Sequence, residues 1–516
     1  MTMRRSVALV CLLTSLSMIA WSQDGSSQSL GDVARKLRKD TTDEVKMTDA
    51  DTKKLFESVD RIFTFASEDS GMPKHAPVKR RLVSKADVEK YASGRLGKEE
   101  YAKQMAQAEL TMKKLGFLPR EFNLRDFLVK ATGQEIAGYY DDETKTISLL
   151  NWVPADRQQP ILAHELTHAL QDQNYDLAKW MKAASKGAAK KHDEIENDDG
   201  AVARKAVVEG SAMVVYVDYV LAPLGRNLKD TPALIYEMEE PAVKAVQDSQ
   251  MMHDAPMILR EAGSFAYNEG LIFEGELLHR GGKEMAFAGV FARPPKNSHE
   301  VLQPQAYLDG EKLPGVGVPD LKQLIGDQYD VYDSGGIGQL DVRAYLKQWG
   351  ERKNADEVSA AWQGGAYVAF RKKGQAASDA APTTTDLATV YVSRWRTSQA
   401  AERFARFYAS AVPLRYHTAT AQPLPACSGK CPVSGAQYLT EEGPVVVEHW
   451  ADDTVIVSES FEAATAFKIR DAVRDSEPLH AVNTREIGLR LLEIPAFEVF
   501  SEQVGSHIAD EISKLQ

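Results

Sequence analysis

The segment Pro160-Ile-Leu-Ala-His-Glu-Leu-Thr-His-Ala-Leu-Gln-Asp172 contains the pattern His-Glu-x-x-His. Its proline suits the first turn of a helix, so we expect a helix from there to about Asp176. His164 and His168 are then four residues apart on one helix face, where both imidazoles can bind one metal ion. Glu165 stands beside that ion, where a general base would take a proton from metal-bound water. The pattern predicts a metal-dependent hydrolase; the alternative is a helix with two ordinary surface histidines.

A third metal ligand is expected further along the chain, because a hydrolytic zinc site usually has three protein ligands and one open position. Glu209, 41 residues after His168, is the best candidate. Its helix is otherwise apolar, and a buried carboxylate needs a partner. The alternative is a carboxylate on an exposed helix face. The competing ligands are the histidines His192, His253 and His279.

Asp172 lies one helix turn after His168. In that position it could accept a hydrogen bond from a ligand histidine and so fix the tautomer and orientation of the ring. The alternative is a solvated helix residue without such a role.

Two further segments frame the metal-binding helix. Residues Glu135 to Leu150 contain two apolar runs around a polar Asp-Asp-Glu-Thr-Lys turn, which predicts a β-hairpin. Residues Ala201 to Leu221 are strongly apolar and predict a buried helix, with Asp199 as its N-cap.

The segment His164-Glu-Leu-Thr-His-Ala-Leu-Gln-Asp172, followed by Glu209-Gly-Ser-Ala212, resembles the gluzincin branch of the zincin metallopeptidases. The resemblance implies that His164, His168 and Glu209 bind one zinc ion. It implies that Glu165 activates water and that Asp172 supports a ligand. Phe265-Ala-Tyr-Asn-Glu-Gly270 and the segment Pro294 to Pro304 also resemble a group of uncharacterised exported bacterial proteins with the same His-Glu-x-x-His pattern.

The same resemblance implies an edge strand above the metal that pairs with an extended substrate. Ile136–Tyr140 and Thr146–Leu150 are the two candidates for that strand. Related enzymes often add a Tyr or His donor that stabilises the oxyanion. Tyr267 is the candidate for this role, with Tyr139 and Tyr140 as rivals.

The N-terminus has the features of a secretory signal over residues 1–22. Arg4 and Arg5 precede an apolar stretch from Ser6 to Trp21, and Ala20-Trp-Ser22 offers the small residues that a signal peptidase reads. The alternative, a membrane anchor, would need about 20 apolar residues, and this run is short for that. We therefore expect an exported protein, periplasmic or extracellular, that has no stable membrane insertion after cleavage.

Net charge and cysteine content narrow the function further. A net charge of −12 argues against sequence-independent nucleic-acid binding, which needs a basic face. After signal cleavage two cysteines remain, Cys427 and Cys431. In an oxidising compartment they can close a small disulfide loop, and two free thiols are the alternative. Two cysteines without a nearby histidine pair are too few for a zinc site of their own.

The expected fold class is α+β: a mainly helical zincin-like metallopeptidase core with a small N-terminal sheet, plus a C-terminal α+β domain. The length of 516 residues allows two to four domains. The N-terminal helical region is either a pro-segment or a helical layer over the core. The boundaries are a signal peptide (1–22), an N-terminal helical region (23–115), the core (116–310), a connecting region (311–385) and the C-terminal domain (386–516).

The expected function is that of a secreted zinc-dependent peptidase in which Glu165 activates zinc-bound water to cleave a peptide or protein substrate. Two alternatives remain open. One is a catalytically idle zinc-binding module used in adhesion or regulation, and the other is a metallo-amidase that acts on cell-wall material. The sequence predicts no particular oligomeric state.

Overall fold

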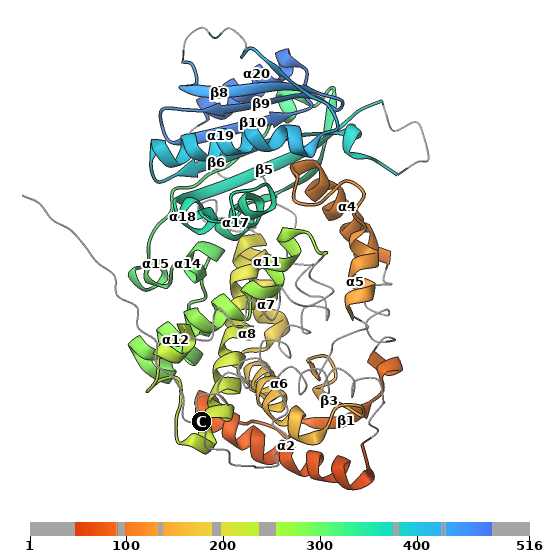
Figure 1. Cartoon of the computed structure of the whole chain (residues 1–516), viewed down its shortest axis with the longest axis vertical. Helices are drawn as coiled ribbons and strands as arrows, with labels where there is room; N and C mark the ends of the chain where they lie inside the picture. Colours follow the sequence, from red (N-terminus) through yellow and green to blue (C-terminus); the bar gives the residue numbers. More distant parts are fainter. Residues whose placement is uncertain are drawn as a thin grey trace, which may run out of the picture. The chain divides into compact units, whose positions relative to one another are not determined.

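Helix α6, Ala155–Tyr175, carries the His-Glu-x-x-His pattern (Figure 1). It begins five residues before Pro160, so the prediction that Pro160 opens the helix is wrong, and the proline lies inside it. The additional turn is held by Gln158, whose side chain bonds to the N–H of Leu150 (3.0 Å), to its C=O (2.9 Å) and to the C=O of Val153 (2.6 Å). These bonds to Leu150 and Val153, which precede the helix, offset the backbone hydrogen bond that Pro160 cannot donate.

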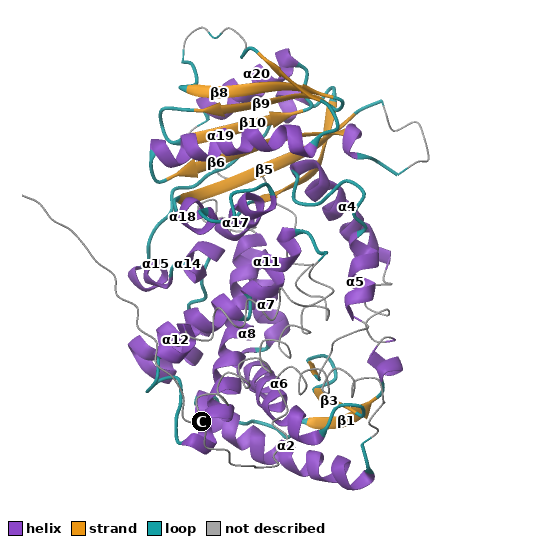
Figure 2. Cartoon of the chain, viewed as in Figure 1, coloured by secondary structure: helices purple, strands orange, loops and turns teal. Residues whose placement is uncertain are grey.

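The computed structural model describes residues 47–88, 90, 99–132, 138–187, 198–236, 254–374, 381–424, 427 and 430–476. The predicted signal peptide, His192 and His253 lie outside the described residues. Within them the chain is an α+β protein, as Figure 2 shows, and this part of the fold prediction is confirmed.

A small sheet precedes α6. It consists of β1 (Lys79–Val83), β2 (Tyr139–Asp141) and β3 (Thr146–Leu150) in the order β1-β3-β2, with β3 parallel to β1 and antiparallel to β2. The predicted hairpin is therefore present in its described part, residues 138–150. Thr146–Leu150 is not an edge strand, which corrects one of the two candidates, because β1 and β2 cover both of its sides. β2 lies at an edge of this sheet.

Helix α8, Asp198–Leu221, is the central helix of the core and packs against α6 and α12 (Asn268–Lys283). Helix α2 (Asp49–Ser70) covers both α6 and α8. Among the described residues, only Asp199–Leu224 is helical, long enough and apolar enough to cross a membrane, but 72% of its apolar window is buried in the protein. Burial of this kind is expected of a core helix in a globular protein.

Asp199 does not cap its own helix, contrary to the prediction. It lies in the first turn of α8, and its Oδ1 accepts a hydrogen bond from the backbone N–H of Ser298 (3.0 Å), the first residue of α14 (Ser298–Leu302). A buried N–H at a helix start requires an acceptor, and Asp199 provides one for the neighbouring helix instead.

Shorter helices complete the core and its surroundings. They are α4 (Glu99–Leu115), α5 (Leu124–Thr132), α7 (Leu177–Gly187), α11 (Met257–Phe265), α13 (Val290–Ala292), α15 (Pro304–Asp309) and α16 (Lys322–Ile325).

The last part of the described chain is a seven-stranded antiparallel sheet in the order β4-β5-β6-β10-β9-β8-β7. Its strands are β4 (Tyr329–Gly336), β5 (Trp362–Lys372), β6 (Leu387–Trp395), β7 (Ala419–Gln422), β8 (Ser434–Thr440), β9 (Gly443–His449) and β10 (Thr454–Glu459). Its helices are α17 (Gln339–Gln348), α18 (Ala355–Ala360), α19 (Ser398–Arg415) and α20 (Ala463–Asp475).

The C-terminal unit starts earlier than the predicted boundary at residue 386. Strands β4 and β5 come from residues 311–385, which were predicted to be a connecting region. β5 pairs with β6 along nearly its whole length, and β4 pairs with β5, so neither strand can be separated from the sheet.

A buried carboxylate, Glu459, joins α4, α19 and β10. Arg415 donates to both of its oxygens (2.8 and 2.9 Å), and the hydroxyls of Tyr408 and Tyr416 donate to one oxygen each (2.7 and 2.6 Å). Arg415 also donates to the backbone C=O of Lys114 in α4 (2.8 Å). Burial alone would raise the pKa of Glu459, but Arg415 and Lys114 outweigh burial and hold this pKa below its usual value.

Glu459→Gln should lower the stability at pH 7 by about 3–5 kcal/mol, because it leaves Arg415 buried without its counter-charge. The folded state lowers the pKa of Glu459, so its stabilising effect is complete above the ordinary value of 4.5 and is lost as the pH falls through the folded-state pKa. The difference between wild type and variant should therefore narrow in acid. Thermal unfolding followed by circular dichroism at pH 7 and pH 4 measures both effects.

Glu402→Gln is the matched control, because it removes an exposed Glu–Arg pair with Arg406 on α19. It should leave the unfolding midpoint at pH 7 unchanged. Equal midpoints for Glu459→Gln and wild type at pH 7 would contradict the role given to Glu459.

Candidate metal centre

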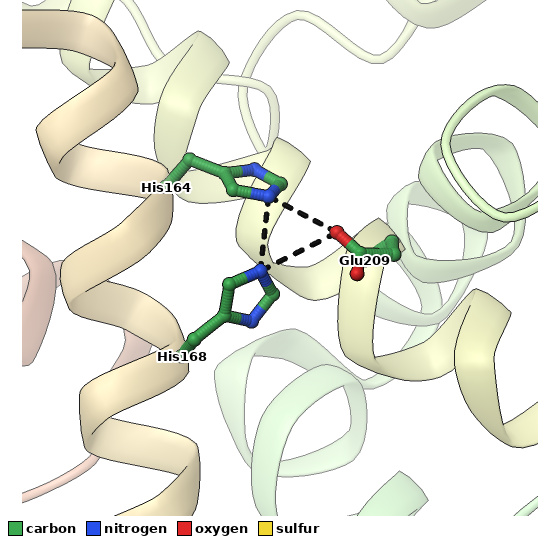
Figure 3. Close-up of side chains that lie close together, drawn as sticks. All are labelled: His164, His168 and Glu209. Atoms are coloured by element: carbon green, nitrogen blue, oxygen red, sulfur yellow. Dashed lines mark hydrogen bonds and ion pairs between the residues drawn. The ribbon is translucent and has the colours of Figure 1, made fainter. Parts of the chain in front are cut away.

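His164 and His168 on α6 meet Glu209 on α8 in the space between the two helices (Figure 3). Nε2 of His164 lies 3.0 Å from Nε2 of His168 and 3.0 Å from Oε2 of Glu209, and Nε2 of His168 lies 3.3 Å from the same oxygen. A tetrahedral zinc site with bonds of about 2.0–2.2 Å places its ligand atoms about 3.3–3.6 Å apart. Two of the observed distances are slightly shorter and the third lies at the lower end of this range, so this group could hold a metal ion.

The histidines converge because they are one turn apart on α6. Glu209 joins them because α8 packs against α6 on one side and closely against α12 on the other. Gly210 faces Gly270 of α12, and a Cβ on Gly210 would lie 2.3 Å from the backbone of Gly270. A Cβ on Gly270 would lie 2.5 Å from the C=O of Ala206. Only glycine permits this approach of two helix backbones. The close contact between Gly210 and Gly270 therefore fixes the position of α8 relative to α12 at the residue next to Glu209.

Glu165, the predicted general base, is buried beside the histidines. Its Oε2 accepts a hydrogen bond from the backbone N–H of Tyr140 on β2 (2.8 Å). The same tyrosine donates its hydroxyl to Oδ2 of Asp172 (2.8 Å), two turns further along α6. Strand β2 therefore makes two hydrogen bonds to α6 through Tyr140, and the one to Glu165 orients its carboxylate.

Asp172 does not bind a ligand histidine, which corrects the prediction for this residue. Its Oδ2 accepts from Tyr140 and from Nζ of Lys145 in the β2–β3 turn (2.5 Å). The charge of Asp172 is thus matched by Lys145, and its side chain faces the hairpin rather than the metal ligands.

Gln171, which was not among the residues predicted from the sequence, contacts His168 in place of Asp172. Its Oε1 lies 2.8 Å from Nδ1 of His168, and its amide donates to the C=O of Val208 (2.9 Å) and to Oγ of Ser211 (2.8 Å) on α8. An Nδ1–H donated to Gln171 leaves Nε2 of His168 free for a metal. A polar side chain three residues after His168, on the same helix face, was the signal that could have indicated this role.

The tyrosines proposed as oxyanion donors have different surroundings. Tyr267, just before α12, is buried, and its ring lies beside that of His164 with centroids 6.1 Å apart and an interplanar angle of 27°. The Tyr140 hydroxyl binds Asp172, and the Tyr139 hydroxyl accepts from Arg81 (3.0 Å). The position of Tyr267 beside His164 is compatible with the predicted donor role, which stays a prediction. The competing ligand His279 is exposed on α12 and does not belong to the metal-binding group.

Two of the three candidate ligands, His164 and Glu209, have the charge state that metal binding requires. Burial would raise the pKa of Glu209, but Lys205 and His168 outweigh burial and hold it well below its usual value, so the carboxylate is ionised. Burial lowers the pKa of His164 to about 4, so this ring is neutral at pH 7. Burial has the same effect on His168, but Glu209 outweighs it and raises the pKa to about 9. A metal must therefore displace one proton from His168.

Comparison with family models matches residues 327–470 to a family described as "Domain of unknown function (DUF8575)". The match covers the seven-stranded sheet and leaves out the three candidate metal ligands. No curated protein matches the chain. No solved structure matches it.

Gly210→Ala should weaken metal binding and lower the stability. The added methyl group meets the backbone of Gly270, so α8 and α12 must separate and move Glu209. Overpacking of this kind costs about 1–3 kcal/mol, and we expect at least a roughly tenfold loss in zinc affinity, because displaced metal ligands bind poorly. Competition with a chromophoric chelator measures the affinity, and thermal unfolding measures the stability.

Gly315→Ala is the control, since a Cβ there would have no atom within 4 Å. Gly315→Ala should retain the zinc affinity and the stability of the wild type. Wild-type zinc affinity in Gly210→Ala would show that the helix crossing does not position Glu209.

Proposed function

We propose that this protein is an exported zinc-dependent peptidase with a zincin-like core. In this proposal His164, His168 and Glu209 bind one zinc ion and Glu165 is the general base. The observation that supports it most is the spacing of the three donor atoms, 3.0–3.3 Å, in a buried group with Glu165 next to it in sequence.

The donor set favours zinc over calcium and magnesium. Two imidazole nitrogens and one carboxylate oxygen are typical of zinc sites in hydrolases. Calcium and magnesium prefer sites built only from oxygen ligands. Three protein ligands also leave room for a further position, which a catalytic site requires.

The proposed reaction is hydrolysis of a peptide bond in a peptide or protein substrate. A bound zinc ion would polarise the scissile carbonyl and make a water molecule more acidic. Glu165 takes a proton from that water, whose oxygen then adds to the carbonyl carbon, and Glu165 returns the proton to the leaving nitrogen. The N–H of Tyr140 keeps the Glu165 carboxylate oriented for these transfers (2.8 Å). Tyr267, beside His164, is the proposed donor to the oxyanion.

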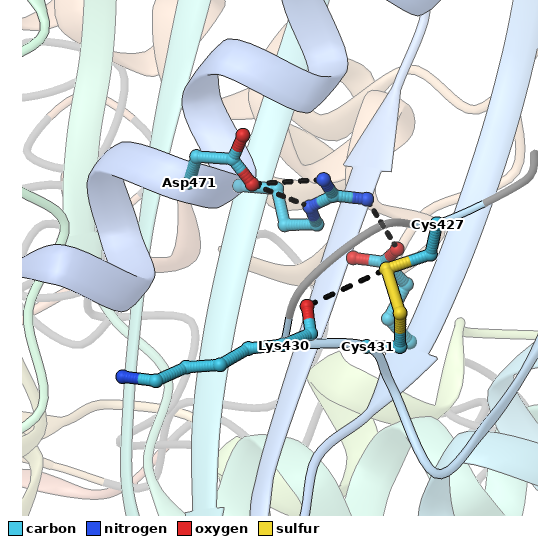
Figure 4. The surroundings of a disulfide bond; sticks show 6 residues. Cys427, Lys430, Cys431 and Asp471 are labelled. Atoms are coloured by element: carbon cyan, nitrogen blue, oxygen red, sulfur yellow. Dashed lines mark hydrogen bonds and ion pairs between the residues drawn. A yellow bond between two sulfur atoms is a disulfide. The ribbon is translucent and has the colours of Figure 1, made fainter.

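The cysteine pair supports export. Cys427 and Cys431 form a disulfide with their Cα atoms 5.7 Å apart (Figure 4). The bond closes a short loop between β7 and β8. Such bonds persist in oxidising compartments and are rare in the cytosol. This agrees with the secretory signal expected over residues 1–22.

Glu165→Gln should bind zinc as the wild type does and lose hydrolysis. The amide keeps the size of the side chain but cannot take a proton, and loss of a general base typically costs about 10²–10⁴-fold in rate. Cleavage of casein, an unstructured protein, measures activity. Wild-type rates in pure Glu165→Gln protein would show that Glu165 is not the base.

Glu209→Ala tests the metal centre itself. Wild-type protein should contain about one zinc per chain, and the variant much less, because one of three ligands is lost. Elemental analysis of purified protein gives both values. A wild type that holds zinc but cleaves nothing would favour an idle zinc-binding module, and one that holds no metal would refute the centre.

A further inference from the structure

Lys205 lies directly against the proposed ligand Glu209. It is not among the site residues predicted from the sequence. The two residues are four apart on α8, and Nζ of Lys205 is 2.5 Å from Oε1 of Glu209. The other oxygen, Oε2, faces both imidazoles. The two oxygens of one carboxylate therefore have separate partners, an ammonium group on one side and the metal-binding histidines on the other.

This ion pair differs from the Lys–Glu pairs that are common on exposed helix faces. Such pairs contribute little, because water screens both charges. Here the side chain of Glu209 is only 2% exposed and that of Lys205 19% exposed, so both charges are largely removed from water. An ion pair in these surroundings is stronger than one in water, and the short contact keeps Oε1 of Glu209 on the side of the ammonium group.

We propose that Lys205 is a positioning residue that restricts Glu209 to binding the metal through one oxygen. This inference rests on the proposed function, since it assigns a role within the same metal centre. With Oε1 bound to the ammonium group, Glu209 offers the ion Oε2 alone. Without Lys205, both oxygens can turn towards the ion and fill the position that a hydrolytic site must keep open.

Lys205 also sets the charge of the centre. Glu165 and Glu209 bring two negative charges, which would cancel those of a divalent ion. The ammonium group of Lys205 leaves the loaded centre with one positive charge instead of none. A net positive centre polarises a bound carbonyl more strongly, because the developing negative oxygen meets an uncompensated charge.

The test uses full-length protein loaded with Co²⁺, whose visible absorption falls when a four-coordinate site becomes five-coordinate. Lys205→Met should lower this absorption and reduce kcat for casein by about 10- to 100-fold, the usual cost of losing a group that orients a metal ligand. KM should change little. Lys205→Arg keeps a cation on Oε1 and should retain the wild-type spectrum and most of the activity.

Lys113→Met is the matched control. Lys113 forms a similarly short pair with Glu109 (2.6 Å) at the same four-residue spacing on α4, with side chains 14% and 19% exposed. It should change neither the spectrum nor kcat. Circular dichroism verifies folding, and Lys205→Gln replaces Lys205→Met if the latter is unfolded.

The outcomes separate this inference from the proposed function. Identical spectra and rates for wild type and Lys205→Met would overturn the role of Lys205 and leave the peptidase intact. Equal effects of Lys205→Met and Lys113→Met would also overturn it. A wild type that binds Co²⁺ and cleaves nothing refutes the peptidase, while the spectra still decide on Lys205. A wild type without Co²⁺ binding refutes both.

Discussion

A negative charge buried on an apolar helix is the constraint on which the core depends. Glu209 is almost fully enclosed on α8, a helix made mostly of small and branched apolar residues. An isolated carboxylate in that place would be very costly, so positive or hydrogen-bonding groups must surround it. His164, His168 and Lys205 are those groups. The packing of α6 against α8 brings the two histidines to this carboxylate, and Lys205 reaches it from the preceding turn of α8.

The parts of the site that follow from local spacing were predictable. Residues four apart on a helix share a face, so the proximity of His164 and His168 follows once the segment is predicted to be helical. Glu209 was found because an acidic residue in an apolar stretch requires an explanation. Whether the chain belongs to the zincins and binds zinc stays a prediction, since the structure gives only the donor group.

The parts that depend on tertiary contacts were not predictable in the same way. The sequence suggests Asp172 as a support for a histidine, but Lys145 reaches Asp172 through the hairpin turn, and Gln171 takes that place. The start of α6 depends on side-chain bonds from Gln158 to the preceding strand, which override the usual preference of proline for a first turn. The C-terminal sheet includes β4 and β5 because of pairing between strands distant in sequence.

The contact between α4 and the C-terminal sheet bears on how the protein matures. Lys114, at the end of the N-terminal helical region, is buried, with Nζ bound to Glu442 (2.7 Å) and to Ser460 (2.6 Å). A pro-segment that is cut off and released must leave a surface that water can solvate. Release of α4 would instead expose an apolar face and strip Glu442 of a buried counter-ion. Helix α4 is thus held by the C-terminal sheet, and a proteolytic cut that spares this contact has to fall before residue 99.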